Sequence, residues 1–377
     1  MMNMNHEQTA LYYRLSRGLV LIQPPLEGVS VNDSDLRPGD IIEHGMDAGR
    51  GNLLGVQPFM RAADYASDEA FSAKLGQYLD RAAQRGWLSE RTIVVWPEYL
   101  GTWLAVAGEG QAVYQAHSLN GAMRALALRH AWHFARGLVS AREKDRVAAS
   151  LFRLKGADMA RRYQAVFSAL ARRYSVTMVA GSILLPSPQV RDGQVIAGDG
   201  PLYNVSAVFA PDGMAHAGLV HKVVPTTTEL PFVAPAPIAE LPIFDTPAGR
   251  LGVLVCADSW YPGPYERLKT QGVELIAVPS FITAAGLWDK PWGGYDGAAA
   301  PADVDLGDVG RITEGQAWRK YALAGRIMSS GARHGINTFL RGALWDLAAD
   351  SGQALAVSGD QVTEAGGVGA AILNLWL

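Results

Sequence analysis

The sequence has one cysteine among 377 residues and no hydrophobic run long enough to cross a membrane. One cysteine cannot form an intrachain disulfide, so the fold is not cross-linked and an oxidising compartment is not implied. The uncharged stretch 275–288 has 14 residues and includes a proline, whereas a membrane-spanning helix needs roughly 18 to 20 apolar residues. Near the N-terminus, the apolar run GLVLI is too short for the core of a signal peptide. We therefore expect a soluble, cytoplasmic protein with no membrane partner.

Neither sign of charge is in clear excess. The chain has 33 basic and 36 acidic residues, a net charge of −3, and no long block of lysine and arginine. A nucleic-acid-binding protein needs such a block to neutralise phosphates, so nucleic acid is excluded as the main partner. Hydrophobic residues make up 49% and charged residues 18% of the chain, which is typical of a soluble globular enzyme.

Apolar runs typical of buried strands alternate with amphipathic segments typical of helices, which predicts an α/β fold with layered sheets. We expect one domain, residues 49–377, preceded by an extension over residues 1–48. The Gly-, Pro- and Asp-rich stretch 286–310 has the composition of an inserted loop, and the last forty residues indicate two or three strands. The other predicted strands are 52–60, 92–101, 175–186, 202–213, 250–256 and 273–281; the predicted helices are 71–87, most of 112–174, 264–272 and 315–335.

The single cysteine, Cys256, ends the apolar run RLGVLVC and is followed by Ala-Asp-Ser-Trp. Side chains at the carboxyl ends of strands face the crevice where α/β folds bind ligands. The N–H groups at the start of the next turn or helix favour a thiolate there. Cys256 is therefore a candidate nucleophile, and the alternative is a small buried hydrophobic residue.

A thiol nucleophile needs a base and a positive or N–H partner for its tetrahedral intermediate. One candidate base is a histidine, but His216, His221 and His334 lie in no recognisable cysteine-protease setting. The other is Glu98, in VVWPEYLG, at the end of a predicted strand.

Lys222 and Glu229 stand together in HKVVPTTTEL, just after the strand predicted at 202–213. Three motifs occur in order along the chain. They are Pro-Glu after a strand, Lys with Pro three residues later, and a strand that ends in Cys-x-Asp. Motifs in this order resemble those of the nitrilase superfamily of carbon–nitrogen hydrolases. LYNVSAVFAPDG, CADSWYPGPYERLKTQGVELIAVPSF and ALWDLAADSGQAL are also similar to that superfamily. The resemblance covers roughly residues 52–377.

The resemblance implies a four-layer α-β-β-α sandwich and a Glu-Lys-Cys triad. Glu98 would be the general base, Cys256 the nucleophile, and Lys222 with the N–H of Ala257 the partners of the developing charge. Glu229 would hold Lys222.

The resemblance requires neither a cofactor nor a metal. His130 and His133 lie three apart on a predicted helix, without a nearby carboxylate or cysteine in the sequence. We therefore assign them surface or packing roles.

The chain departs from the superfamily's usual pattern at three places. His221 stands where arginine is common, Gly263 follows Pro262 where many members have Pro-Glu, and RIMSSGARHG (326–335) replaces Arg-Ala-x-Glu-Asn. These departures bear on local support and subunit contacts. The resemblance implies a homodimer or higher homo-oligomer. The long interval between Glu98 and Lys222 predicts an insertion at about 112–160.

Residues 257–260 read Ala-Asp-Ser-Trp, where true nitrilases show Trp-Glu. This favours hydrolysis of a small amide or N-carbamoyl compound over hydrolysis of a nitrile. A catalytically silent binding or assembly module with the same fold is a third possibility. The candidates for contact with substrate are Trp103, Trp260, Tyr203 and Phe281. Trp103 and Trp260, with Trp288 and Trp292, could equally pack the insertions against the sandwich.

Overall fold

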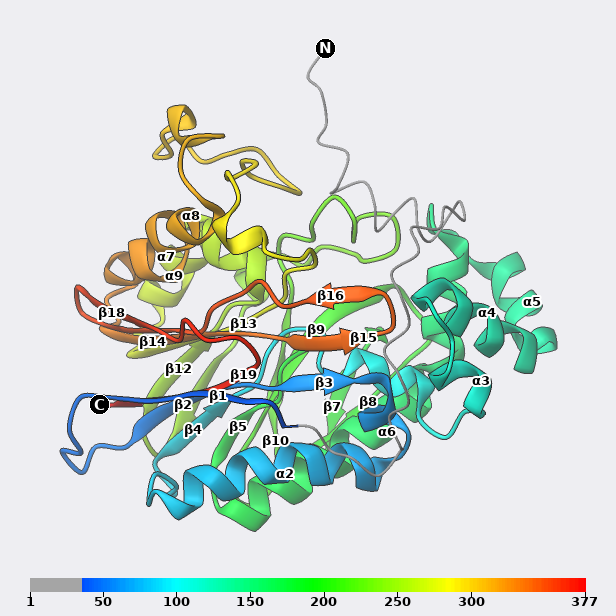
Figure 1. Ribbon diagram of the computed structural model, residues 1–377, viewed down its shortest axis with the longest axis horizontal. Coiled ribbons are helices and arrows are strands. Elements are labelled where there is room, and N and C mark those ends of the chain that lie inside the picture. Colours follow the sequence, from blue (N-terminus) through cyan, green and yellow to red (C-terminus); the bar gives the residue numbers. More distant parts are fainter. Residues whose placement is uncertain (1–35) are drawn as a thin grey trace.

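The computed structural model describes residues 36–377, which form two large β-sheets packed face to face (Figure 1). The first sheet has the strand order β1-β19-β2-β4-β5-β9-β10, and β6 also pairs with β9. Its strands are β1 (Pro38–His44), β2 (Asn52–Gln57), β4 (Thr92–Val95), β5 (Thr177–Val179), β6 (Ile183–Pro186), β9 (Leu202–Phe209), β10 (Ala215–His221) and β19 (Ala370–Trp376).

The second sheet has the order β11-β12-β13-β14-β17-β18. Its strands are β11 (Ile243–Thr246), β12 (Gly249–Val253), β13 (Leu275–Ser280), β14 (His334–Phe339), β17 (Leu355–Ser358) and β18 (Gln361–Glu364). Two small sheets accompany the large ones. One contains β3 (Phe59–Arg61), β15 (Arg341–Leu344) and β16 (Leu347–Ala349), and the other contains β7 (Gln189–Arg191) and β8 (Gln194–Ile196).

Helices cover the outer faces of both large sheets (Figure 1). The first sheet is covered by α2 (Asp68–Gln84) and α6 (Arg146–Tyr174), and the second by α7 (Pro262–Thr270), α8 (Glu314–Tyr321) and α9 (Leu323–Arg326). The short helix α3 (Gln111–Tyr114) leads to α4 (Leu119–Arg129) and α5 (Ala131–Ser140), which lie at one end of the molecule. The predicted four-layer α-β-β-α architecture is confirmed.

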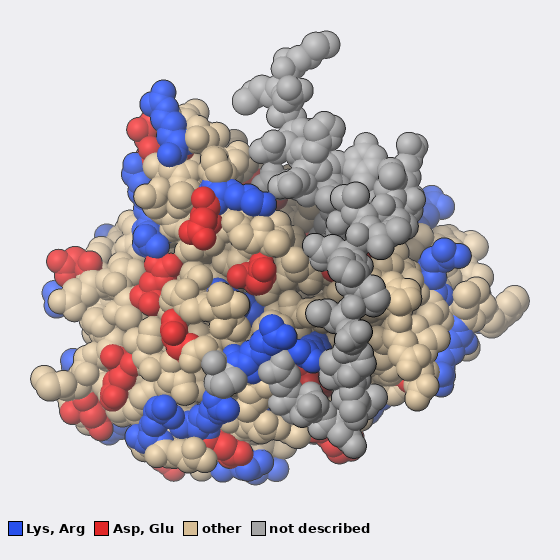
Figure 2. Space-filling view, viewed as in Figure 1, with Lys and Arg blue, Asp and Glu red and all other residues tan. Residues whose placement is uncertain are grey.

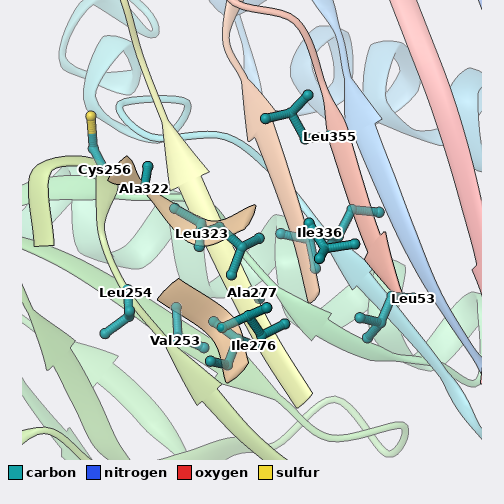
Figure 3. Close-up of a cluster of buried hydrophobic side chains, with 14 of the residues drawn as sticks. Leu53, Val253, Leu254, Cys256, Ile276, Ala277, Ala322, Leu323, Ile336 and Leu355 are labelled. Atoms are coloured by element: carbon teal, nitrogen blue, oxygen red, sulfur yellow. The ribbon is translucent and has the colours of Figure 1, made fainter. Parts of the chain in front are cut away.

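The strand sequences explain why both faces of the first sheet are covered. Alternate residues of a strand point to opposite faces, and in β2 the successive residues Leu53 and Leu54 are both fully buried. Leu53 packs between the sheets with Val253 and Ile336 of the second sheet (Figure 3). Leu54 instead joins the cluster that contains Phe71 of α2. Continuous apolar runs of this kind mark strands with no solvent-exposed face.

Several predicted elements were wrong in their extent. The strands predicted at 92–101 and 202–213 end at Val95 and Phe209, and the strand predicted at 175–186 is two strands, β5 and β6. The strand predicted at 250–256 ends at Val253, and the predicted helix 315–335 is divided at Ala322, whose φ and ψ are −103° and −145°. The last two residues of that predicted helix, 334 and 335, belong to β14. The final forty residues hold five strands from β15 to β19, where two or three were expected. Short strands rich in Gly and Ala carry too little periodicity to be recognised individually.

Residues 1–35 of the predicted N-terminal extension lie outside the described residues. Within 36–48, β1 pairs in parallel with β19 at the edge of the first sheet. The predicted insertion at 112–160 holds α4, α5, most of α3 and the first half of α6, and that at 286–310 holds only two short 3-10 turns. Over the part of the chain that the structure describes, no helix is both long and apolar enough to span a membrane.

Candidate active site

Three chain segments from the two facing sheets meet at Glu98, Lys222 and Cys256. Glu98 lies three residues after β4, and Lys222 directly follows β10, both in the first sheet. Cys256 lies three residues after β12 of the second sheet. All three side chains are buried, with Glu98 and Lys222 each 1% exposed. The sequence prediction therefore named three residues that the fold brings together.

Lys222 joins two carboxylates at the centre of this site. Its Nζ lies 2.8 Å from Oε1 of Glu98 and 2.6 Å from Oε2 of Glu229. The amide of Asn204, on β9, donates to the same Oε1 of Glu98 at 2.9 Å and to Oε1 of Glu229 at 3.0 Å. One ammonium and one amide thus hold both carboxylates in fixed positions, as buried charges require.

The carboxylate of Glu229 accepts more hydrogen bonds than that of Glu98. The hydroxyl of Tyr99 donates to Oε1 of Glu229. The N–H and the hydroxyl of Thr226 donate to its Oε2 at 2.8 and 3.0 Å. Because its acceptor sites are occupied by donors, Glu229 is suited to fix Lys222 and not to exchange protons.

Cys256 opens a 3-10 helix, Cys256–Trp260, and has a φ of +50°. This left-handed conformation is uncommon for a residue with a side chain, and strained residues of this kind cluster at active sites. The thiol and the carboxylate of Glu98 lie close enough to shift each other's pKa, and Sγ lies 3.8 Å from the carbonyl oxygen of Phe281. In Figure 3 the sulfur points away from the other side chains of the cluster. The backbone turn therefore directs the thiol toward Glu98.

Asp258 links the segment that carries Cys256 to the segment that carries Lys222. Its Oδ1 accepts the N–H groups of Val223 at 3.0 Å and Val224 at 2.7 Å. Its Oδ2 accepts the N–H of Val255 at 3.2 Å. The side chain of Asp258 is fully buried, so these backbone hydrogen bonds replace its hydration.

Burial sets the pKa of Glu98, which rises from an ordinary 4.5 to about 7. The positive charge of Lys222 opposes this rise, and the negative charge of Glu229 adds to it. Burial also acts to lower the pKa of Lys222, but the charges of Glu229 and Glu98 outweigh it and raise that pKa well above its ordinary value. For Glu229, burial is outweighed by Lys222, so its pKa is lowered. The site thus holds a charged lysine, an ionised Glu229 and a Glu98 able to exchange a proton near neutrality.

Burial raises the pKa of the Cys256 thiol well above its ordinary value, and the negative charge of Glu98 raises it further. The expectation that the turn favours a thiolate was therefore wrong for the resting site. Desolvation and a neighbouring carboxylate outweigh the N–H groups of one short 3-10 helix. A thiol with a raised pKa needs a neighbouring base to take its proton before it can act as a nucleophile.

Comparison with known protein families identifies the family to which the chain belongs. The family described as "Carbon-nitrogen hydrolase" matches residues 56–294. The chain belongs to this family. Its solved relatives in the nitrilase superfamily include a mutant of the amidase from Nesterenkonia sp. AN1. That structure superposes with a TM-score of 0.52 at 14% identity, covering 88% of this chain and 93% of the amidase chain. At this identity the likeness shows a shared fold.

Curated relatives of this carbon–nitrogen hydrolase match over shorter stretches. A deaminated glutathione amidase of Yersinia enterocolitica is 47% identical over 47 residues, which are 12% of this chain and 16% of the relative. Nitrilase 2 of Arabidopsis thaliana is 30% identical over 127 residues, 30% of this chain and 36% of the relative. Both matches span well under half of the relatives' length.

The histidines considered as bases lie in other surroundings. The ring of His221 packs edge-on against Tyr203, with Nδ1 3.2 Å from the carbonyl oxygen of Leu219. His216 packs against Phe244, and His334 lies 3.3 Å from the hydroxyl of Ser358. Within residues 36–377, no histidine hydrogen-bonds to Cys256.

Phe281, one of the residues predicted to contact substrate, lies beside the thiol. Its carbonyl faces Cys256, and its ring packs edge-on against that of Tyr99, with centroids 5.7 Å apart. Trp103, in the segment after Glu98, is 9% exposed and packs edge-on against Trp345. Tyr203, on β9, contacts His221.

Trp260 belongs to an aromatic cluster that joins the 286–310 loop to the second sheet. It stacks on Trp292 with centroids 5.9 Å apart and packs edge-on against Trp318 of α8. The ring of Trp288 is also stacked with that of Trp318. These contacts are those of side chains that pack the inserted loop against the sandwich.

Sequence reasoning missed Tyr99, Asn204 and Asp258 as members of the site. Asn204 and Asp258 stand in motifs that supported the family resemblance, Tyr-Asn and Cys-x-Asp, so their positions carried a signal. Tyr99, in contrast, has a φ of +62° and reaches Glu229 across 130 positions of sequence. Only the folded chain reveals that contact.

Outside this site, His130 contacts a carboxylate that lies 21 positions earlier in the sequence. Its Nε2 lies 3.0 Å from Oε1 of Glu109, which is also bound by Lys155 at 2.8 Å. Among the described residues, no group of three or more His, Cys, Asp or Glu side chains could hold a metal ion.

Proposed function

We propose that the protein hydrolyses a carbon–nitrogen bond other than a peptide bond, in a small amide or an N-carbamoyl compound, through a thioester on Cys256. The observation that carries this proposal is the contact of one buried carboxylate, Glu98, with both the Cys256 thiol and the Lys222 ammonium. Membership of the carbon–nitrogen hydrolase family supports the same chemistry.

In the first half of the reaction, Glu98 takes the proton of the thiol as Sγ attacks the carbonyl carbon. The negative charge that develops on the carbonyl oxygen is stabilised by the ammonium of Lys222 and the N–H of Ala257. Glu98 then gives its proton to the departing nitrogen, and the carbon–nitrogen bond breaks. Ammonia or an amine leaves, and the acyl group stays on sulfur as a thioester.

In the second half, Glu98 takes a proton from water, and the resulting hydroxide attacks the thioester carbon. The carbon–sulfur bond breaks as the tetrahedral intermediate collapses, and Glu98 returns the proton to the leaving thiolate. The products are an acid and the restored thiol. A pKa of about 7 suits Glu98 for both directions of transfer.

A nitrilase reaction, which converts a nitrile to an acid and ammonia, is the second candidate because Nitrilase 2 of Arabidopsis thaliana is a sequence relative. The same thiol would attack the nitrile carbon and form a thioimidate. The Ala-Asp-Ser-Trp sequence after the nucleophile favours the amide.

Release of ammonia or amine from a panel of primary amides, N-carbamoyl compounds and nitriles tests the proposal. Activity on amides or ureides that is lost in Cys256→Ala and kept in His221→Ala would support it. Activity on nitriles alone would select the nitrilase reaction. Inactivity across the panel, together with a thiol no more reactive toward iodoacetamide than a small thiol, would favour a silent binding or assembly module.

We further propose a cytoplasmic homodimer or higher homo-oligomer that needs no cofactor. Size-exclusion chromatography with light scattering tests the assembly, and a monomer at micromolar concentration would contradict it.

A further inference from the structure

The segment that holds α4 and α5 has an unusual charge for this chain. Between residues 111 and 142 the sequence has four arginines and three histidines but no aspartate, glutamate or lysine. The whole chain carries a net charge of −3, so the positive charge here is local. All four arginines are exposed: Arg124, Arg129, Arg136 and Arg142.

Large apolar side chains accompany these arginines on the surface. Leu128 is 75%, Trp132 73% and Val139 87% exposed. Trp132, Arg136 and Val139 are spaced four and three residues apart on α5, so they share one face of that helix. No residue of α5 is buried. We call Arg124, Leu128, Trp132, Arg136 and Val139 the α4–α5 face.

The junction between α4 and α5 is held by contacts with Glu109. Glu109 is bound by Arg129 at 3.2 Å, by His130 at 3.0 Å and by Lys155 of α6 at 2.8 Å. These contacts fix the end of α4 against the long helix α6. The α4–α5 face therefore lies on two helices that are anchored to α6, and not on an irregular loop.

We propose that the α4–α5 face docks peripherally on an anionic lipid surface. Arginines beside exposed tryptophan, leucine and valine are the composition of helices that lie in the interfacial region of a membrane. The cations are attracted to acidic headgroups while the apolar side chains enter the boundary of the acyl chains. The face also lies at an extremity of the molecule, where Figure 2 shows blue and tan surface.

A second copy of the chain fits this face less well. A symmetric dimer places the same patch of both subunits in contact, which would oppose arginines to arginines with no carboxylate in the segment to neutralise them. The expectation of no membrane partner came from the lack of a spanning segment, which does not bear on peripheral contact.

Sedimentation with lipid vesicles tests this inference, which is independent of the proposed hydrolysis. The full chain should bind vesicles of phosphatidylcholine with 30% phosphatidylglycerol, bind phosphatidylcholine alone at least tenfold more weakly, and be released by 0.5 M NaCl. Leu128→Ser with Trp132→Ser, and separately Arg124→Glu with Arg136→Glu, should each weaken binding at least about tenfold.

Matched controls keep the result specific to the α4–α5 face. Leu306→Ser removes another exposed leucine, and Arg191→Glu with Arg333→Glu reverses two exposed arginines elsewhere; both should bind as the unchanged protein does. Melting temperatures verify that each variant folds. Absence of binding to anionic vesicles, or binding that neither double variant weakens, would overturn the inference. So would an oligomer that the Leu128→Ser, Trp132→Ser variant dissociates, because the face would then be a subunit contact.

Discussion

The carboxylate of Asp258 accepts the N–H of Val223, the residue after Lys222, at 3.0 Å. Asp258 itself stands two residues after Cys256. One side chain thus fixes the spacing between the segment of the nucleophile and the segment of the lysine.

Asp258→Asn should therefore impair turnover without removing a group that touches substrate. The asparagine oxygen can still accept from Val223 and Val224, but its amide nitrogen would face the N–H of Val255, donor against donor. An unsatisfied buried donor costs about 1–3 kcal/mol, and we expect kcat to fall roughly 10- to 100-fold with KM nearly unchanged.

Steady-state kinetics and thermal unfolding of Asp258→Asn check this, with Asp258→Ala beside it. If Asp258→Asn loses stability while kcat is intact, Asp258 supports the fold and does not position the site.

Replacing Glu98 by glutamine should remove the base and leave the thiol buried and protonated. We expect kcat for a good amide substrate to fall about 10²- to 10⁴-fold. His221→Ala should change kcat by less than about threefold, since His221 faces Tyr203 and Leu219. The reverse pattern in the same assay would identify a Cys-His hydrolase.

The pH dependence of kcat/KM should follow Glu98. Burial raises its pKa to about 7, and only its ionised form can take the proton of the thiol. The rate should therefore decrease as pH falls through about 7 and level off above it. A profile flat from pH 5 to 8 would show that Glu98 does not act as the base.

Lys222→Met should destabilise the protein as well as inactivate it. It leaves Glu98 and Glu229 buried without their shared cation. Breaking a buried ion pair by removing one partner costs about 3–5 kcal/mol, which denaturant unfolding would detect. Adding Glu229→Gln should restore part of the stability and none of the activity. A double variant no more stable than the single one would contradict this account of the site.

The sequence was sufficient to predict the fold class and to name Glu98, Lys222, Cys256 and Glu229, because the short motifs that contain them resemble those of a known superfamily. It could not predict how far the thiol's pKa rises, since that depends on burial by residues distant in sequence. The hydrogen bond from Tyr99 to Glu229 was missed for the same reason. The break at Ala322 was missed because the helical pattern continues through it and only packing interrupts the helix.

The position of β19 has a consequence for how the chain folds during synthesis. β19 lies between β1 and β2, and its Asn374 hydrogen-bonds to Asn52 across 322 positions. The first sheet therefore stays open along one edge of β2 until β19 has been synthesised and has left the ribosome. A nascent chain that exposes such an edge can pair with other chains. The chain is thus more prone to aggregation before β19 is in place than after.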